Sequence, residues 1–298
     1  MSDSQKTLAI VSVVGQDQKG VVARVSTCLA ERAVNIEDIE QRVLQGLFIM
    51  NMLVDLSDVS VSLDELIHDL TEQGTALGMT VEVRLLGRRR ERAYAVLVSK
   101  EPHCLEKILE DVDSGAIPTA PAVVLSNHEV LRTLAGKAGI PFEFYPQQDR
   151  AERDAAMIAS LRTRNLDLVV LARYMQILTK PFVDAFPSRI INIHPSLLPF
   201  HPGANAYKQA FEHGNRVAGC TAHFVTEDLD EGPIILQDVF HIAVGEDTLD
   251  DVKRKGRELE AKVLSKAIQL YLNNELLVKD GKVVYKPGMD FFRKHHTL

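Results

Sequence analysis

The chain has 298 residues, of which 46% are hydrophobic and 25% are charged, close to the proportions of average globular proteins. A chain of this length and composition buries one or two cores, which excludes a disordered chain, a collagen-like repeat and a disulfide-stapled miniprotein. The formal net charge of -7 is opposite in sign to that of most proteins that bind nucleic acids or anionic membranes. We therefore expect a small molecule or another protein as the partner.

The cysteines and the N-terminus indicate a reducing compartment. Cys28, Cys104 and Cys220 are widely spaced and include no CxxC pair, so they predict neither a disulfide framework nor a zinc site. No apolar run approaches the ~18 residues of a membrane span. No basic segment precedes the first apolar stretch, as it would in a secretory signal. We expect a cytoplasmic protein that binds neither nucleic acid nor a membrane.

Residues 1–86 predict one small α/β domain. Continuous or alternating apolar runs predict its strands, and apolar residues at helical spacing predict its helices. In chain order we expect a strand at 8–14, a helix at 21–30, strands at 34–43 and 47–56, a helix at 61–77 and a strand at 80–86. This βαββαβ order is that of a ferredoxin-like fold. The charged segment 87–92 predicts a linker.

Residues 93–298 predict a second domain, in which short apolar strands alternate with helices. We expect strands at 93–98, 122–126, 142–145, 166–171 and 189–194, with helices at 103–113, 129–138 and 149–164 between them. This alternation favours a doubly wound, mostly parallel sheet with ligands at the carboxyl ends of its strands. Two further strands, at 221–226 and 234–244, and a helix at 248–273 follow. The tail has a hairpin-like Asp-Gly turn.

Histidines are dense in the second domain, but their spacing does not predict a metal site. Five of the ten lie between residues 194 and 241, namely His194, His201, His213, His223 and His241. No HxxxH or CxxC pair is present, so we expect no metal. No GxSxG, GxGxxG or Walker A motif is present either, which disfavours serine-hydrolase, dinucleotide and nucleotide-phosphate chemistry.

The strand that ends at residue 194 carries two polar side chains. Asn192 and His194 are two residues apart, so they point to the same face of a strand. An amide there can donate to an oxyanion, and an imidazole can move a proton. The alternative is that they only satisfy backbone groups at a strand end. Asp228 and Asp230 lie in an acidic loop, and a carboxylate can hold an imidazole, although spacing alone does not bring Asp230 to His194.

Two motifs resemble those of the folate-dependent formyltransferase and hydrolase family. They are INIHPSLLP (191–199) and GCTAHFVTEDLDEGPIILQ (219–237). The resemblance implies a Rossmann-like formyltransferase domain in which Asn192, His194 and Asp230 are catalytic. LARYMQIL (171–178) is similar to the family's folate-binding segment. The substrate-binding residues that follow from the resemblance are Met175, Gln176, Ile177, Leu178, Asp228 and Gly232.

The N-terminal segment 13–41 resembles an ACT domain, a ferredoxin-like regulatory fold. In that family the turn from Asp17 to Gly20, and the pair Asn35 and Ile36, would frame contacts with a small ligand or a subunit. An amino-acid effector and a purely structural dimerisation role both remain open. ACT modules often associate, so we expect a homodimer or homotetramer.

An ACT domain followed by a formyl-handling domain resembles the formyltetrahydrofolate deformylase family. This implies hydrolysis of 10-formyltetrahydrofolate to tetrahydrofolate and formate, which balances the one-carbon pool and supplies formate for purine synthesis, with no tightly bound cofactor. The loop at 98–104 has no glycine, Pro102 has no N–H donor, and Glu101 would repel a phosphate. A phosphorylated acceptor is therefore disfavoured and water is expected.

Two other functions remain open. One is formyl transfer to an unphosphorylated amine, and the HPSLLP form at 194–199 is more usual among transformylases. The other is a non-catalytic protein that senses folate or amino acids. Within the leading hypothesis, either His194 or Asp230 takes the proton of the water. A Cys-His nucleophile pair at His103 and Cys104 is disfavoured, because adjacent residues rarely face one another.

Overall fold

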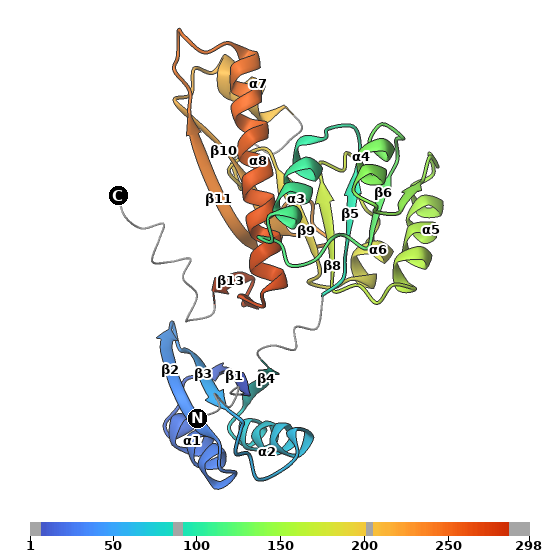
Figure 1. The fold of residues 1–298 in the computed structure, drawn as a ribbon. Coiled ribbons are helices and arrows are strands. Elements are labelled where there is room, and N and C mark those ends of the chain that lie inside the picture. The colour runs from blue at the N-terminus through green and yellow to red at the C-terminus, as the bar shows by residue number, and fades with distance from the viewer. Residues whose placement is uncertain (1–6, 86–91, 201–204, 286–298) are drawn as a thin grey trace. The chain divides into compact units, whose positions relative to one another are not determined.

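The computed structural model describes residues 7–85, 92–200 and 205–285. The chain divides into two compact units (Figure 1), the first with the elements β1 to β4 and the second with those from β5 onward. The predicted linker at 87–92 lies, apart from Arg92, outside the described residues, as does the tail beyond residue 285, and its assignment stays a prediction. Over the described ranges, no helix has the length and apolar character needed to cross a membrane.

The first unit has the predicted βαββαβ order. Its elements are β1 (Leu8–Gln16), α1 (Val21–Glu31), β2 (Asn35–Leu44), β3 (Leu47–Asp55), α2 (Leu63–Ala76) and β4 (Met79–Leu85). The strands form an antiparallel sheet in the order β2-β3-β1-β4. Val25 and Leu29 of α1 and Leu66 and Leu70 of α2 are buried with the central strands in one core. The ferredoxin-like expectation is confirmed.

The second unit is an α/β sheet of seven strands. Its elements are β5 (Tyr94–Val98), α3 (His103–Asp113), β6 (Val123–Ser126), α4 (Arg132–Lys137), β7 (Phe142–Phe144), α5 (Arg150–Arg162), β8 (Leu168–Ala172), α6 (Lys180–Ala185), β9 (Ile190–His194), α7 (Ala206–Glu212), β10 (Val217–Phe224), β11 (Ile234–His241) and α8 (Leu249–Leu272). The order is β11-β10-β9-β8-β5-β6-β7. Strands β5 to β9 run parallel, and β10 and β11 pair antiparallel, so the mostly parallel fold is confirmed.

Two features were not predicted or differ in extent, whereas a third, the Asp-Gly turn, was predicted and is confirmed. Helices α6 and α7 have only six and seven residues, too few to show a clear apolar period. Strand β10 begins at Val217, four residues before the predicted start, because its first part pairs with β11. The Asp-Gly turn does join a hairpin, β12 (Leu276–Lys279) and β13 (Lys282–Tyr285), with Asp280 and Gly281 at positive φ.

The order in which the chain adds strands to the sheet reverses between β5 and β8. The chain moves outward from β5 to β6 and β7, and then returns to place β8 and β9 on the other side of β5. The loops that leave the carboxyl ends of β5 and β8 therefore diverge, which opens a crevice at this edge of the sheet. Ser99 follows β5 and Arg173 follows β8. This topology places a ligand site next to Arg173 and the end of β9.

Two helical glycines test whether close packing controls the stability of the second unit. A Cβ at Gly256 of α8 would lie 2.4 Å from the buried ring of Tyr207, whereas one at Gly136 of α4 meets no atom within 4 Å. We expect Gly136→Ala to stabilise by up to about 1 kcal/mol through helix propensity. We expect Gly256→Ala to destabilise despite the same propensity gain, because overpacking costs about 1–3 kcal/mol. Thermal unfolding should shift in opposite directions, and a parallel shift would contradict the packing argument.

Candidate active site

Asn192 and His194 are placed by the register of β9. Asn192 pairs with Leu171 of β8 on one side and with His223 of β10 on the other, and His194 pairs with Thr221. Their side chains share one face of the strand, as the two-residue spacing predicts. His194 is only 7% exposed. The polar pair thus lies at the carboxyl end of a buried strand, beside the reversal of the sheet.

The structure brings Asp230 to His194. The Nδ1 atom of His194 lies 3.2 Å from Oδ2 of Asp230, and the carboxyl group is largely buried. A hydrogen bond from His194, more than any other factor, lowers the pKa of Asp230. A carboxylate only accepts hydrogen bonds, so Nδ1 of His194 carries the hydrogen of this contact. Nε2 is the second nitrogen of the ring. Nε2 is buried, and it has no hydrogen-bond partner within the described residues.

His223 is a site residue that the sequence reasoning counted but did not select. Its Nδ1 lies 3.0 Å from the carbonyl oxygen of Phe224, and its Nε2 lies 3.2 Å from Nδ2 of Asn192. The carbonyl can only accept, so Nδ1 is the donor. Burial lowers the pKa of His223, which keeps the ring neutral and leaves Nε2 as an acceptor. Nε2 therefore fixes the orientation of the Asn192 amide and leaves its second N–H free to donate.

One sequence signal points to His223. It is a polar residue within the predicted strand at 221–226, and the register of the sheet places it opposite Asn192. The motif that contains Asp230 also contains His223. Its Nε2 lies 3.6 Å from Oδ1 of Asp230. Selecting it from the sequence would have required the pairing of β9 with β10.

The segment that follows His194 is held by hydrogen bonds from the buried Thr221 of β10 and from Gln237 of β11. The hydroxyl of Thr221 donates to the carbonyl of Ser196 (2.7 Å) and accepts from the backbone N–H of Leu198 (3.1 Å). The side-chain amide of Gln237 donates to the same hydroxyl (2.8 Å) and to the carbonyl of Leu198 (2.9 Å). Buried polar networks of this kind give a single arrangement when every member is satisfied. They fix the direction in which the chain leaves His194.

A cavity of about 280 Å³, which we call the β8–β9 cavity, lies against these residues. Asn192, His194, His223 and Asp230 all line it. The predicted substrate-binding residues that line it are Met175, Gln176, Ile177, Leu178 and Asp228. Met175 and Ile177 are about half exposed, 51% and 48%. Large apolar side chains left open around a concave site are typical of a ligand-binding surface.

Gly232 does not line the β8–β9 cavity. A Cβ there would lie 1.7 Å from the carbonyl oxygen of Phe224, so only glycine allows the loop to pass β10 at this distance. The backbone N–H of Phe224 also donates to the carbonyl of Pro233 (2.9 Å). Asp230 itself has a φ of 59°, in the left-handed region that Asp tolerates better than most residues. These constraints bring Asp230 back to His194.

A buried ion pair supports the wall of the cavity. Arg153 and Asp154 of α5 are each 1% exposed, and Arg153 NH2 lies 2.9 Å from Oδ1 of Asp154. Arg153 NH1 also donates to Oε1 of Gln176 (3.0 Å), and Oδ2 of Asp154 accepts from the backbone N–H of Thr179 (2.7 Å). On the other side, the hydroxyl of Ser99 accepts from the backbone N–H of Met175 (3.0 Å). The loop after β8 is therefore anchored along its length.

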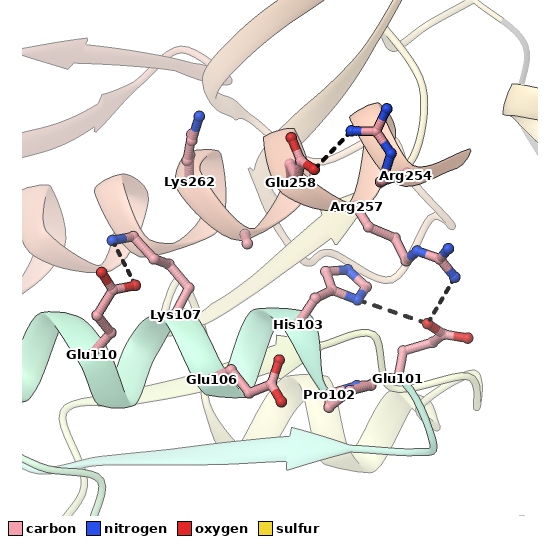
Figure 2. Close-up of a pocket in the computed structure, with 11 residues that line it drawn as sticks. Glu101, Pro102, His103, Glu106, Lys107, Glu110, Arg254, Arg257, Glu258 and Lys262 are labelled. Carbon is pink, nitrogen blue, oxygen red and sulfur yellow. Dashed lines mark hydrogen bonds and ion pairs between the residues drawn. The ribbon is translucent and has the colours of Figure 1, made fainter. Parts of the chain in front are cut away.

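In the glycine-free loop after β5, the charged side chain of Glu101 lies close to basic side chains. Figure 2 shows the Glu101 carboxylate near His103 and Arg257, at 3.8 Å and 3.7 Å. On its other ring nitrogen, Nε2, His103 lies 3.0 Å from Oε2 of the buried Glu260. The groove in Figure 2, between α3 and α8, has acidic and basic side chains side by side, among them Lys107 with Glu110. This mixture presents no field of one sign to a polyanion.

One group of potential metal ligands occurs within the described ranges. His103, Cys104 and Glu260 have ligand atoms within 4.8 Å of one another. Glu260 is already paired with His103 and with Arg173, whose Nε lies 3.3 Å from it. Burial raises the pKa of the Cys104 thiol well above its usual value. A protonated thiol is a poor metal ligand and a poor nucleophile, so this cluster is better described as a buried ion-pair network.

The predicted ACT residues lie at two places in the first unit. Asp17 belongs to the loop after β1, and its backbone N–H donates to the carbonyl of Gly46 (2.8 Å). Gly20 caps α1 with a φ of 89°, a conformation that glycine adopts without strain. Asn35 and Ile36 begin β2. Their role in ligand or subunit contacts stays a prediction.

Two family models match the chain. Residues 7–84 match the model described as an ACT domain, and residues 92–268 match the model described as formyl transferase. The chain is 38% identical over 284 residues to the formyltetrahydrofolate deformylase of Synechocystis sp., which covers 94% of this chain and 99% of that protein. The similarity therefore extends through both units.

Solved structures agree in fold. A crystal structure of a formyltetrahydrofolate deformylase from Pseudomonas syringae pv. tomato is similar over 95% of each chain, with a TM-score of 0.86 and 31% identity. Glycinamide ribonucleotide transformylase 1 from Symbiobacterium toebii is similar over 68% of this chain and 96% of that chain, with a TM-score of 0.63 and 38% identity. The deformylase matches over the greater part of the chain.

The buried, neutral His223 predicts a pH dependence of stability. Its pKa is lower in the folded than in the unfolded chain, so below the ordinary value of 6.5 the unfolded chain binds more protons. Stability should therefore fall as the pH drops from 7 to 5. We expect His223→Gln to reduce this fall, measured as thermal midpoints at several pH values. The same change at the exposed His213 is the matched control, and an equal slope in His223→Gln and wild type would contradict the assignment.

Proposed function

The chain belongs to the formyl transferase family and, within it, to the formyltetrahydrofolate deformylases, and on this basis we propose that it hydrolyses 10-formyltetrahydrofolate to tetrahydrofolate and formate. One observation carries the proposal for the site. His194 is held by Asp230 through Nδ1, it lines the β8–β9 cavity, and its Nε2 has no hydrogen-bond partner among the described residues. A ring held in this way has one nitrogen free to act on a bound substrate.

The folate would bind in the β8–β9 cavity. Met175 and Ile177 offer apolar surface to an aromatic ring system, and the backbone of the same loop offers hydrogen-bonding groups. The buried Arg153–Asp154 pair supports a loop that is already in place before substrate binds. A preformed site loses less entropy on binding than a flexible one. Asp228, which also lines the cavity, is proposed to contact the polar part of the ring.

Hydrolysis begins when water attacks the formyl carbon. His194 takes a proton from the water at Nε2, and Asp230 stays ionised and stabilises the resulting imidazolium. The lowered pKa of Asp230 supports this role for His194, since it keeps the carboxyl group ionised and makes it a weaker base. Asn192 donates its free N–H to the oxyanion of the tetrahedral intermediate.

Collapse of the intermediate completes the reaction. The bond between the formyl carbon and N10 breaks, and His194 returns its proton to N10. Tetrahydrofolate leaves with that proton, and the formic acid that remains ionises to formate. His223 holds the Asn192 amide in the donating orientation, because its neutral Nε2 accepts one of the two amide hydrogens. No tightly bound cofactor enters this route, and a cytoplasmic location stays a prediction.

We propose that the ACT domain binds a free amino acid and that the chain forms a homodimer or homotetramer. The match over residues 7–84 supports small-molecule binding by this domain. Gly20 and the start of β2 at Asn35 are the proposed contacts. An amino acid that regulates a working enzyme is compatible with the proposed hydrolysis.

Formate release in the absence of any acceptor tests the proposed hydrolysis. We expect wild type to release formate from 10-formyltetrahydrofolate alone. Asn192→Ala should lower kcat by about 10²–10³-fold, the usual loss for an oxyanion donor. His194→Ala and Asp230→Asn should each lower it by about 10²–10⁴-fold. His213→Ala, at an exposed histidine outside the cavity, is the control, and near wild-type rates in the His194 or Asp230 variant would refute the assigned roles.

A thermal-shift screen with each free amino acid tests the ACT proposal. Binding to the folded state at a hundredfold excess over Kd adds about 2.7 kcal/mol to the free energy of unfolding. We expect at least one amino acid to raise the midpoint, and Asn35→Ala to reduce that rise. No shift with any amino acid would instead favour a structural role for the domain.

A further inference from the structure

A second cavity adjoins the proposed folate site. This α7–α8 cavity, also of about 280 Å³, lies between the two helices for which it is named. It shares two lining residues with the β8–β9 cavity, Arg173 and Pro195. Arg173 directly follows the last residue of β8, and Pro195 directly follows His194, the last residue of β9. Along the described part of the chain, these two residues are the common wall of the two cavities.

The side chain of Arg173 makes an ion pair from this wall. Its Nε lies 3.3 Å from Oε2 of Glu260, a carboxylate that is only 1% exposed on α8. The same Oε2 lies 3.0 Å from Nε2 of His103, so Glu260 is itself held from a third element. Arg173 thus pairs with a buried carboxylate and at the same time lines both cavities.

The backbone at Arg173 is strained. Its φ is 59°, in the left-handed region that glycine enters without cost and that a long side chain rarely adopts. Such an outlier persists only where the surrounding structure enforces it, and it favours a functional reason for the residue. A glycine would fit this backbone better and would leave the wall open. The chain instead has an arginine that reaches a buried carboxylate.

We propose that Arg173 is a specificity-determining residue that keeps amines away from the formyl carbon, so that water is the acceptor. The inference rests on the proposed hydrolysis. A folate seated in the β8–β9 cavity covers the formyl carbon from that side, so a second molecule would have to approach through the α7–α8 cavity. That cavity is large enough for a small organic amine, and its lining includes Arg173 and Pro195, the residue that follows His194. Water is small enough to be enclosed with the substrate.

Opening the wall would allow formyl transfer by the same chemistry. The amine nitrogen forms a bond to the formyl carbon, and the bond from that carbon to N10 breaks. The proton lost by the amine passes through His194 to N10. The products are a formamide and tetrahydrofolate, with no change of oxidation state and no additional reactant. The ratio of formamide to formate therefore reports which nucleophile reaches the carbon, independently of the overall rate.

Arg173→Gly tests the proposal. The variant relieves the left-handed strain and leaves Glu260 paired with His103, so we expect it to fold. With 10-formyltetrahydrofolate and an excess of glycinamide, wild type should yield formate. The fraction of formyl groups recovered as N-formylglycinamide, measured by mass spectrometry against a reaction without enzyme, should rise at least tenfold in the variant. Arg173→Asn, a smaller side chain that tolerates positive φ, should give the same change.

Ser188→Gly is the matched control, because Ser188 also has a positive φ of 56° but is exposed and lines neither cavity. Its product ratio should equal that of wild type. Folded Arg173 variants that still give only formate would overturn the proposal. So would folded variants that give neither product, since Arg173 would then serve hydrolysis itself. Formyl transfer by wild type at the level of the Arg173 variants would also overturn the proposal. A wild type that releases no formate would instead overturn the proposed function.

Discussion

The contact between His194 and Asp230 is the interaction on which the proposed chemistry depends. It joins the end of β9 to a loop beyond β10, and it is 3.2 Å long. Several features of the fold are needed to form it. The register of β9 with β10 sets the position of His194 along the sheet, and the absence of a side chain at Gly232 lets the loop pass close to Phe224. The hydrogen bond then lowers the pKa of Asp230, and it leaves Nε2 of His194, a residue that lines the cavity, without a hydrogen-bond partner among the described residues.

The second support of the site is a buried ion pair that has no part in the chemistry. Removing Arg153 and Asp154 from water is costly, and the cost is offset only if the remaining donors and acceptors are satisfied. Here they are satisfied by the loop that lines the cavity, through Gln176 and the backbone N–H of Thr179. The stability of α5 and the shape of the proposed folate site therefore depend on the same hydrogen bonds. A site supported in this way is preorganised for its ligand.

The same fold serves hydrolases and transferases, so the identity of the acceptor has to be decided by the loops around a common centre. In this chain two loops that carry charged side chains leave the neighbouring strands β5 and β8, where the order of the strands reverses. The first places Glu101 in ion pairs with His103 and Arg257, and the second places Arg173 against Glu260. Both loops thus carry charged side chains that are paired with neighbouring residues.

The sequence by itself determined the two folds, because apolar periodicity and turn residues are local signals, and its motifs identified Asn192, His194 and Asp230 as candidates. It missed the short helices α6 and α7, which have too few residues for a period. It did not select His223, whose significance comes from its place opposite Asn192 on a neighbouring strand. Only the tertiary structure decided that Asp230 meets His194, that Gly232 is required by a close approach to Phe224, and that Arg173 pairs with Glu260. These contacts join residues far apart in the chain, and strand register and loop closure, which bring them together, leave no periodic trace in the sequence.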